Sequence, residues 1–181
     1  MKKTLLFAAC LAAFAAQAQD RLFTYTYQSN VLNQGQKEIE VWNTIRTGRK
    51  DFYLRYDHRT EFEIGLGRNL QTAFYLNATS KTQTANEGGS KHFETENELS
   101  FSNEWKLKLL DPVANPVGLA LYGEYGIGSN EFEFEGKLLV DKKVNKLTFA
   151  ANAVYELELK PEYSGDELEW EKEHKLDFHA P

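Results

Sequence analysis

The residues with the most chemistry in this sequence are carboxylates and lysines that recur at every second position. Over residues 93–109 the acids and lysines share one parity with two serines, while every large apolar residue falls on the other. A period of two is that of a β-strand with two unlike faces, because successive side chains point to opposite sides. Other segments extend the charged face, and the candidates for lining a lumen are Arg55, Arg59, Glu94, Glu96, Glu98, Glu104, Lys106, Glu133, Glu135, Glu156 and Glu158.

These charges allow two interpretations. Rings of acidic side chains select cations when they line a pore. A solvated, salt-bridged interior with no role in transport has the same residue pattern, and strand number separates the two. Eight strands leave a barrel interior just filled by side chains, whereas larger barrels open an aqueous channel.

Three histidines are the remaining candidates for catalysis or metal binding. His58, His92 and His174 each lie one or two residues from an acid, but His58 and His174 fall on the apolar parity and so do not converge with the charged set. The sequence has no Gly-rich phosphate loop, no Cys/His metal spacing and no serine elbow. We therefore expect no enzyme, no catalytic residue, no cofactor and no metal site.

The elements that position these residues are predicted to be strands throughout. Alternation predicts strands over residues 37–47, 52–66, 70–78, 93–109, 117–127, 131–140, 147–160 and 173–178. No segment offers the crossover helix that parallel strands require. The predicted fold is all-β, an antiparallel up-and-down transmembrane β-barrel of about eight strands. Outer-membrane barrels pair short periplasmic turns with longer outer loops, which puts 68–69, 111–116 and 142–146 in the periplasm and 48, 86–90, 129 and 161–169 outside.

Strand length indicates which face meets lipid. Strands in globular proteins usually run about 3 to 10 residues, whereas the strands predicted over residues 52–66 and 93–109 are longer. Aromatic residues also recur on the apolar parity, as in the aromatic girdles at the two membrane interfaces. The expected lipid-facing residues are Leu99, Phe101, Trp105, Leu119, Leu121, Phe132, Phe134 and Phe149. The alternative is a soluble barrel of the lipocalin kind, in which the apolar parity points inward.

The N-terminus predicts export. Two lysines, an apolar run of twelve residues and the small-x-small site Ala16-Gln17-Ala18 form a signal peptide over residues 1–18. A lipid-modified Cys10 is the less favoured alternative, since Phe7 stands where a lipobox usually has Leu. Residues 19–36 are expected to form a periplasmic lead-in arm and residues 37–181 the barrel.

The mature chain is acidic. Cleavage takes two of the 21 basic residues and leaves 19 against 27 acids, a formal charge of −8 without any cysteine. Such a chain is not suited to phosphate backbones, so we expect no nucleic-acid partner. The expected partners are membrane lipid, the outer-membrane assembly machinery and an unidentified small solute.

Three segments carry a resemblance: EFEIGLGRNL over residues 61–70, LDP over 110–112 and VGLALYGEYG over 117–126. With them the chain resembles a family of uncharacterised outer-membrane β-barrels of Gram-negative bacteria. The resemblance implies an outer-membrane location and a transporter-like or porin-like barrel, usually of more than eight strands. Such barrels end on an aromatic residue, whereas Phe178 is followed by His179, Ala180 and Pro181. We therefore expect the N-terminal part of a larger, incomplete barrel.

The expected function is a passive pore or transporter-like channel for small solutes in the outer membrane, with a weak preference for cations. Two alternatives remain at this point. One is a non-conducting structural barrel, and the other is a soluble exported barrel that binds an apolar ligand.

Overall fold

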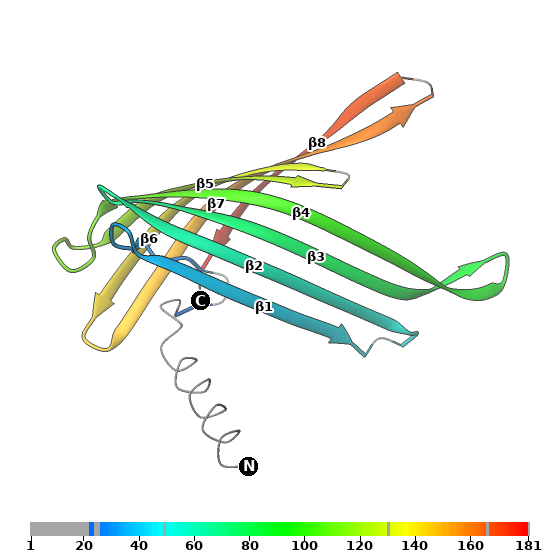
Figure 1. Ribbon diagram of the computed structural model, residues 1–181, viewed down its shortest axis with the longest axis horizontal. Coiled ribbons are helices and arrows are strands. Elements are labelled where there is room, and N and C mark those ends of the chain that lie inside the picture. Colours follow the sequence, from blue (N-terminus) through cyan, green and yellow to red (C-terminus); the bar gives the residue numbers. More distant parts are fainter. Residues whose placement is uncertain (1–21, 24–25, 49, 130, 166, 181) are drawn as a thin grey trace, which may run out of the picture.

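The computed structural model describes residues 22–23, 26–48, 50–129, 131–165 and 167–180. The predicted signal peptide lies outside the described residues. The described residues form eight strands in one antiparallel sheet whose spatial order is the sequence order (Figure 1): β1 (Lys37–Thr47), β2 (Tyr53–Gly67), β3 (Leu70–Glu87), β4 (Ser90–Leu110), β5 (Gly118–Gly128), β6 (Phe132–Val144), β7 (Leu147–Ser164) and β8 (Glu167–His179).

This arrangement confirms the predicted all-β, antiparallel, up-and-down fold with eight strands. Within the described part of the chain the sheet is open, since β1 and β8 are its two edges. The β3–β4 and β7–β8 hairpins extend beyond their neighbours at one end of the sheet (Figure 1).

Two connections predicted as loops are tight turns instead. β3 and β4 continue to a two-residue turn at Gly88 and Gly89, both of which have positive φ (60° and 85°). Likewise β7 continues to Ser164 and β8 begins at Glu167, so most of the polar stretch 161–169 is strand. Polar composition did not distinguish strand from loop in these segments, because a strand that is exposed to water on both faces has the same residue types as a loop.

The opposite end of the sheet follows the prediction more closely. Arg68 and Asn69 form the predicted two-residue turn with φ of 51° and 62°. The longer connection after β4 is organised by Asp111, whose carboxylate accepts hydrogen bonds from Val113 N (2.9 Å) and Lys108 Nζ (3.0 Å). The Val113 N–H and then the Lys108 ammonium lower the pKa of Asp111 from its ordinary value of 3.8.

Burial is inverted relative to a water-soluble sheet. We call the side that carries the charged parity the inner face and the other the outer face. On the inner face Glu61, Glu104 and Asn152 are fully buried, whereas on the outer face Leu99 is 64% and Phe149 58% exposed. The one apolar cluster found among the described residues is small, consisting of Ala120, Tyr122 and Leu139 with Tyr27 packed against them on the inner face.

Candidate functional site

The inner face carries a row of glutamates at one level of the sheet. Glu104 lies directly opposite Glu124, which lies opposite Glu135, which lies opposite Glu156. We call these four residues the acidic row. Directly opposed like charges destabilise a sheet, because their side chains are about 5 Å apart. The predicted residues Glu104, Glu135 and Glu156 are therefore brought together, at an electrostatic cost that the surroundings have to offset.

Lysines provide part of that compensation. Lys137 Nζ lies 2.6 Å from Glu135, and Lys175 Nζ lies 3.1 Å from Glu156, which it faces across β7 and β8. In the next row Glu133 lies opposite Glu158, and Lys160 Nζ is 2.7 Å from Glu158. The predicted residues Glu133 and Glu158 thus belong to the same charged surface.

One carboxylate cluster in this surface has the geometry to hold a cation. Single oxygens of Glu133, Glu135 and Glu156 all lie within 4.8 Å of one another. Two of the three are already paired with lysines. Charge compensation by protein groups is therefore the simplest explanation of the cluster.

Three predicted lining residues lie apart from this surface. Glu94, Glu96 and Glu98 share its parity but are exposed on the part of β4 that extends towards the Gly88–Gly89 turn. Glu96 pairs with Lys81 at 2.7 Å, and this hydrogen bond raises the pKa of Lys81. These acids lie on the part of β4 that extends beyond the end of β5, although Glu96 and Glu98 are in the same rows as Arg55 and Asp57 of β2.

A segment of main chain crosses the inner face. We call residues 26–36 the strap; it is not a strand and turns at Gly35 (φ 78°) before it continues into β1. Asn152 of β7 holds the main chain of Tyr27 by two hydrogen bonds, from Tyr27 N (2.7 Å) and to Tyr27 O (2.9 Å). The described part of the predicted lead-in arm therefore lies against the sheet along its inner face.

Further contacts fix the strap along its length. Asp141 of β6 accepts from Ser29 N (2.8 Å), and Gln71 of β3 accepts from Leu32 N (2.8 Å). The Tyr27 ring lies 5.3 Å from that of Tyr122, with the Lys137 ammonium 4.3 Å above it. Because these partners come from β3, β5, β6 and β7, the strap spans most of the width of the sheet.

Two strand glycines make room for the strap. A Cβ at Gly65 would lie 2.7 Å from Leu32 O, and one at Gly118 would lie 2.7 Å from Asp141 Oδ1 and against Ser29 Oγ. Both distances are shorter than a carbon atom tolerates, so only glycine fits. A glycine inside a strand marks close approach of another backbone, and this was the one sequence signal for the strap.

The inner face and the strap border two cavities that are open to solvent. The smaller, about 250 Å³, lies between the strap and residues of β1 to β4, including Glu38, Glu63 and Lys106. The larger, about 560 Å³, is lined by residues of β1 to β6 and by His179 of β8, and Tyr27 of the strap contributes to its wall. The predicted residues Arg55, Arg59, Glu133 and Glu135 line this larger cavity.

Sequence reasoning missed several residues of the enclosed surface. Glu61 and Tyr75 are buried there, and the Tyr75 hydroxyl donates to the carboxylate of Glu104. Their alternation was visible, but nothing in the sequence distinguishes a buried inner residue from an exposed one of the same parity.

The predicted lipid-facing residues lie on the outer face. Seven of the eight are exposed, while Leu119 is half-buried. Aromatic pairs on this face include Phe74 with Phe101 (6.3 Å between centroids) and Phe132 with Trp170 (5.8 Å).

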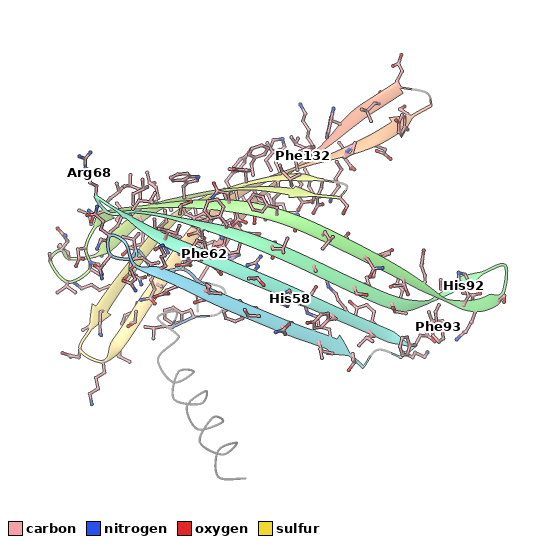
Figure 2. All side chains as sticks on the ribbon, viewed as in Figure 1. His58, Phe62, Arg68, His92, Phe93 and Phe132 are labelled. Atoms are coloured by element: carbon pink, nitrogen blue, oxygen red, sulfur yellow. The ribbon has the colours of Figure 1, made fainter. Side chains whose placement is uncertain are left out.

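The histidines do not converge. Figure 2 shows His58 midway along β2 and His92 at the far end of the β3–β4 hairpin. His58 bonds to Asn43 and Thr60, and His174 bonds to the Tyr155 hydroxyl. His58 and His174 are therefore engaged by near neighbours in the sheet.

In the part of the chain that the structure describes, none of the residues belongs to a helix long and apolar enough to cross a membrane. The model of a family of unknown function (DUF6662) matches residues 15–178. Neither the curated proteins nor the solved structures include a match.

Proposed function

The chain belongs to the family of unknown function DUF6662, and we propose from its own geometry that it is an outer-membrane β-barrel protein. In this proposal the outer face meets lipid, and the inner face surrounds a water-filled interior that admits small hydrophilic solutes. The N-terminal 18 residues direct export, and the barrel inserts in the outer membrane of a Gram-negative cell.

The inverted burial is the observation that carries this proposal. A soluble sheet protein buries its apolar parity, whereas here that parity is exposed on every strand, as at Ile39, Phe74 and Leu121. Monomeric soluble proteins rarely expose a contiguous apolar area of more than a few hundred Å². Lipid accounts for such a face without an additional protein partner.

Strand length supports the same assignment. A tilted strand crosses the hydrocarbon layer with about 9–11 residues, and every strand here has at least 11. The excess of β3, β4, β7 and β8 extends past this span at one end (Figure 1). Glu96, exposed on that extension, and its half-buried partner Lys81 are then outside the hydrocarbon layer.

The strap favours a second candidate, a barrel that does not conduct. It covers the acidic row at Tyr27, where Lys137 and Tyr122 pack against it. If the strap stays in place, the interior is partly plugged and the protein serves as a structural barrel.

Reconstitution tests the proposal. The mature chain is refolded in detergent, mixed with phosphatidylcholine vesicles and floated through a density gradient, and the same preparation is added to a planar bilayer under a KCl gradient. Flotation together with conductance, and a reversal potential of the sign for cations, is the expected result. Flotation without conductance supports the plugged barrel, and a soluble chain that does not float refutes membrane insertion.

A further inference from the structure

The larger cavity, which we call the vestibule, has two charged walls of opposite sign. One wall, from β1 and β2, contains Arg46, Arg55 and Arg59 with Asp57; we call it the basic wall. The other, from β5, β6 and the turn between them, contains four glutamates and one lysine, and we call it the acidic wall: Glu124, Glu131, Glu133, Glu135 and Lys137.

Local pairing leaves both walls charged. On the basic wall Asp57 pairs with both Arg46 and Arg55, so two guanidinium groups share one carboxylate. Arg59 donates to Asn77 Oδ1 (2.8 Å), and its guanidinium lies 5.0 Å from the Tyr75 ring centroid. These contacts hold Arg59 in place without neutralising it.

On the acidic wall, Lys137 pairs with Glu135 at 2.6 Å, and Lys160 lies 3.6 Å from Glu131. Four carboxylates still face one lysine of the lining. The residues that β3 and β4 place between the walls are uncharged: Asn77, Thr79, Ser100 and Ser102. The vestibule lining therefore has an excess of guanidinium groups on the β1–β2 side and an excess of carboxyl groups on the β5–β6 side.

We propose that the vestibule binds short peptides with free termini, with the peptide carboxylate at the basic wall and its ammonium at the acidic wall. This inference rests on the proposed function, since it names the class of solute that the interior receives. Guanidinium groups match a carboxylate with two parallel hydrogen bonds. Glutamates accept from an ammonium, and the hydroxyl and amide groups between the walls serve the peptide backbone.

The dimensions fit a peptide of three or four residues. β2 and β5 are three strand spacings apart, or about 14 Å along the sheet. Each extended residue spans about 3.3–3.6 Å, so four residues cover that length, and fewer suffice because the wall side chains reach inward. The volume of about 560 Å³ lies in the range of about 300–1,000 Å³ typical of small-molecule sites.

Binding of defined peptides to the full mature chain in detergent tests this assignment. Isothermal titration compares tetra-alanine with free termini, its N-acetylated form and its C-amidated form. We expect each blocked form to bind at least tenfold more weakly than the free peptide. Equal binding of all three forms, no binding of the free peptide, or equal binding of the free and amidated forms would overturn the proposal.

Two variants test which wall binds which terminus of the peptide. Arg59→Gln should abolish the preference for a free C-terminus and keep that for a free N-terminus, while Glu133→Gln should do the reverse. Glu96→Gln, which neutralises an acid of the same parity outside the vestibule, is the matched control and should leave both preferences unchanged. Circular dichroism verifies folding, and this crossed pattern is one that general destabilisation would not produce.

The outcome is separable from that of the proposed function. Titration in detergent requires neither a bilayer nor conduction. A chain that conducts ions but does not distinguish these peptides overturns the vestibule assignment and leaves the membrane proposal standing. A chain that binds them with the crossed pattern but never enters vesicles refutes the membrane proposal instead.

Discussion

A charge placed on the outer face is the sharpest test of the lipid assignment, and Leu121→Lys is the substitution of choice. Leu121 is 47% exposed and lies opposite Leu107 and Leu138, which are also exposed. In water a lysine at such a position changes the free energy of unfolding within about 0.5 kcal/mol. In lipid the same change costs about 2–4 kcal/mol at the midplane and about 0–1 near the interfaces.

The position of Leu121 along its strand sets the expected value. It is two residues from Gly123, the middle of β5. With a rise of about 3.4 Å per residue and a tilt of about 40°, it lies about 5 Å from the midplane of a layer whose half-thickness is about 12 Å. We therefore expect a loss of about 2 kcal/mol, or about a 30-fold change in the folding equilibrium constant.

Urea unfolding in phosphatidylcholine vesicles, followed by tryptophan fluorescence, measures this loss. Leu168→Lys is the matched control, because Leu168 is 52% exposed on the same face but lies on the β7–β8 extension, opposite Tyr163. It should cost about 0–1 kcal/mol, the value near the interface. Equal effects of the two substitutions would show that depth in a bilayer does not matter and would refute the reasoning.

Three further perturbations test the strap and the turn. Asn152→Ala removes both hydrogen bonds to the main chain of Tyr27, so the free energy of unfolding in urea should fall by about 1–3 kcal/mol. Chymotrypsin should also cleave the strap faster in this variant. An unchanged cleavage rate would contradict the docking of the strap on the sheet. Gly118→Ala forces a Cβ against the strap and should cost about 1–3 kcal/mol, whereas Gly123→Ala, where no described atom lies within 4 Å, should stay within about 0.5 kcal/mol. Asp111 has a lowered pKa, so its ionised form binds its partners in the folded state, and its contribution to stability is complete above its ordinary value of 3.8 and disappears as the pH falls through the folded pKa. Urea midpoints at pH 6 and pH 3 should differ less for Asp111→Asn than for the unsubstituted chain, and equal differences would contradict this account.

Alternation predicted the fold well because, in a sheet with one apolar and one charged face, the two-residue period specifies which residues share a face. The parity assigned to Glu104 and Trp105 matches their burial, since the former is fully buried and the latter is 46% exposed. The turn at Arg68 and Asn69 was predicted as well. The register shift between Gly65 and Gly67, which keeps the charged parity of β2 and β3 on one face, was not.

The strap was not predictable in the same way. Asn152 and Tyr27 are 125 residues apart, and no local pattern joins them. Residues 26–36 contain turn-forming Asn and Gly but have no regular alternation of apolar and polar residues. The sequence therefore predicted an arm and gave no position for it on the sheet. Its position depends on long-range satisfaction of main-chain polar groups, which single-residue propensities do not encode.

The strap also bears on how the proposed barrel closes. The interior of an eight-strand barrel is just filled by side chains, yet here the inner face accommodates eleven residues of main chain as well as a cavity of about 560 Å³. Pairing β1 directly with β8 would remove the space that the strap and the vestibule occupy and would leave Asp141 and Asn152 without the main-chain groups they bind. The contacts of the strap therefore keep the β1 and β8 edges of the described sheet apart.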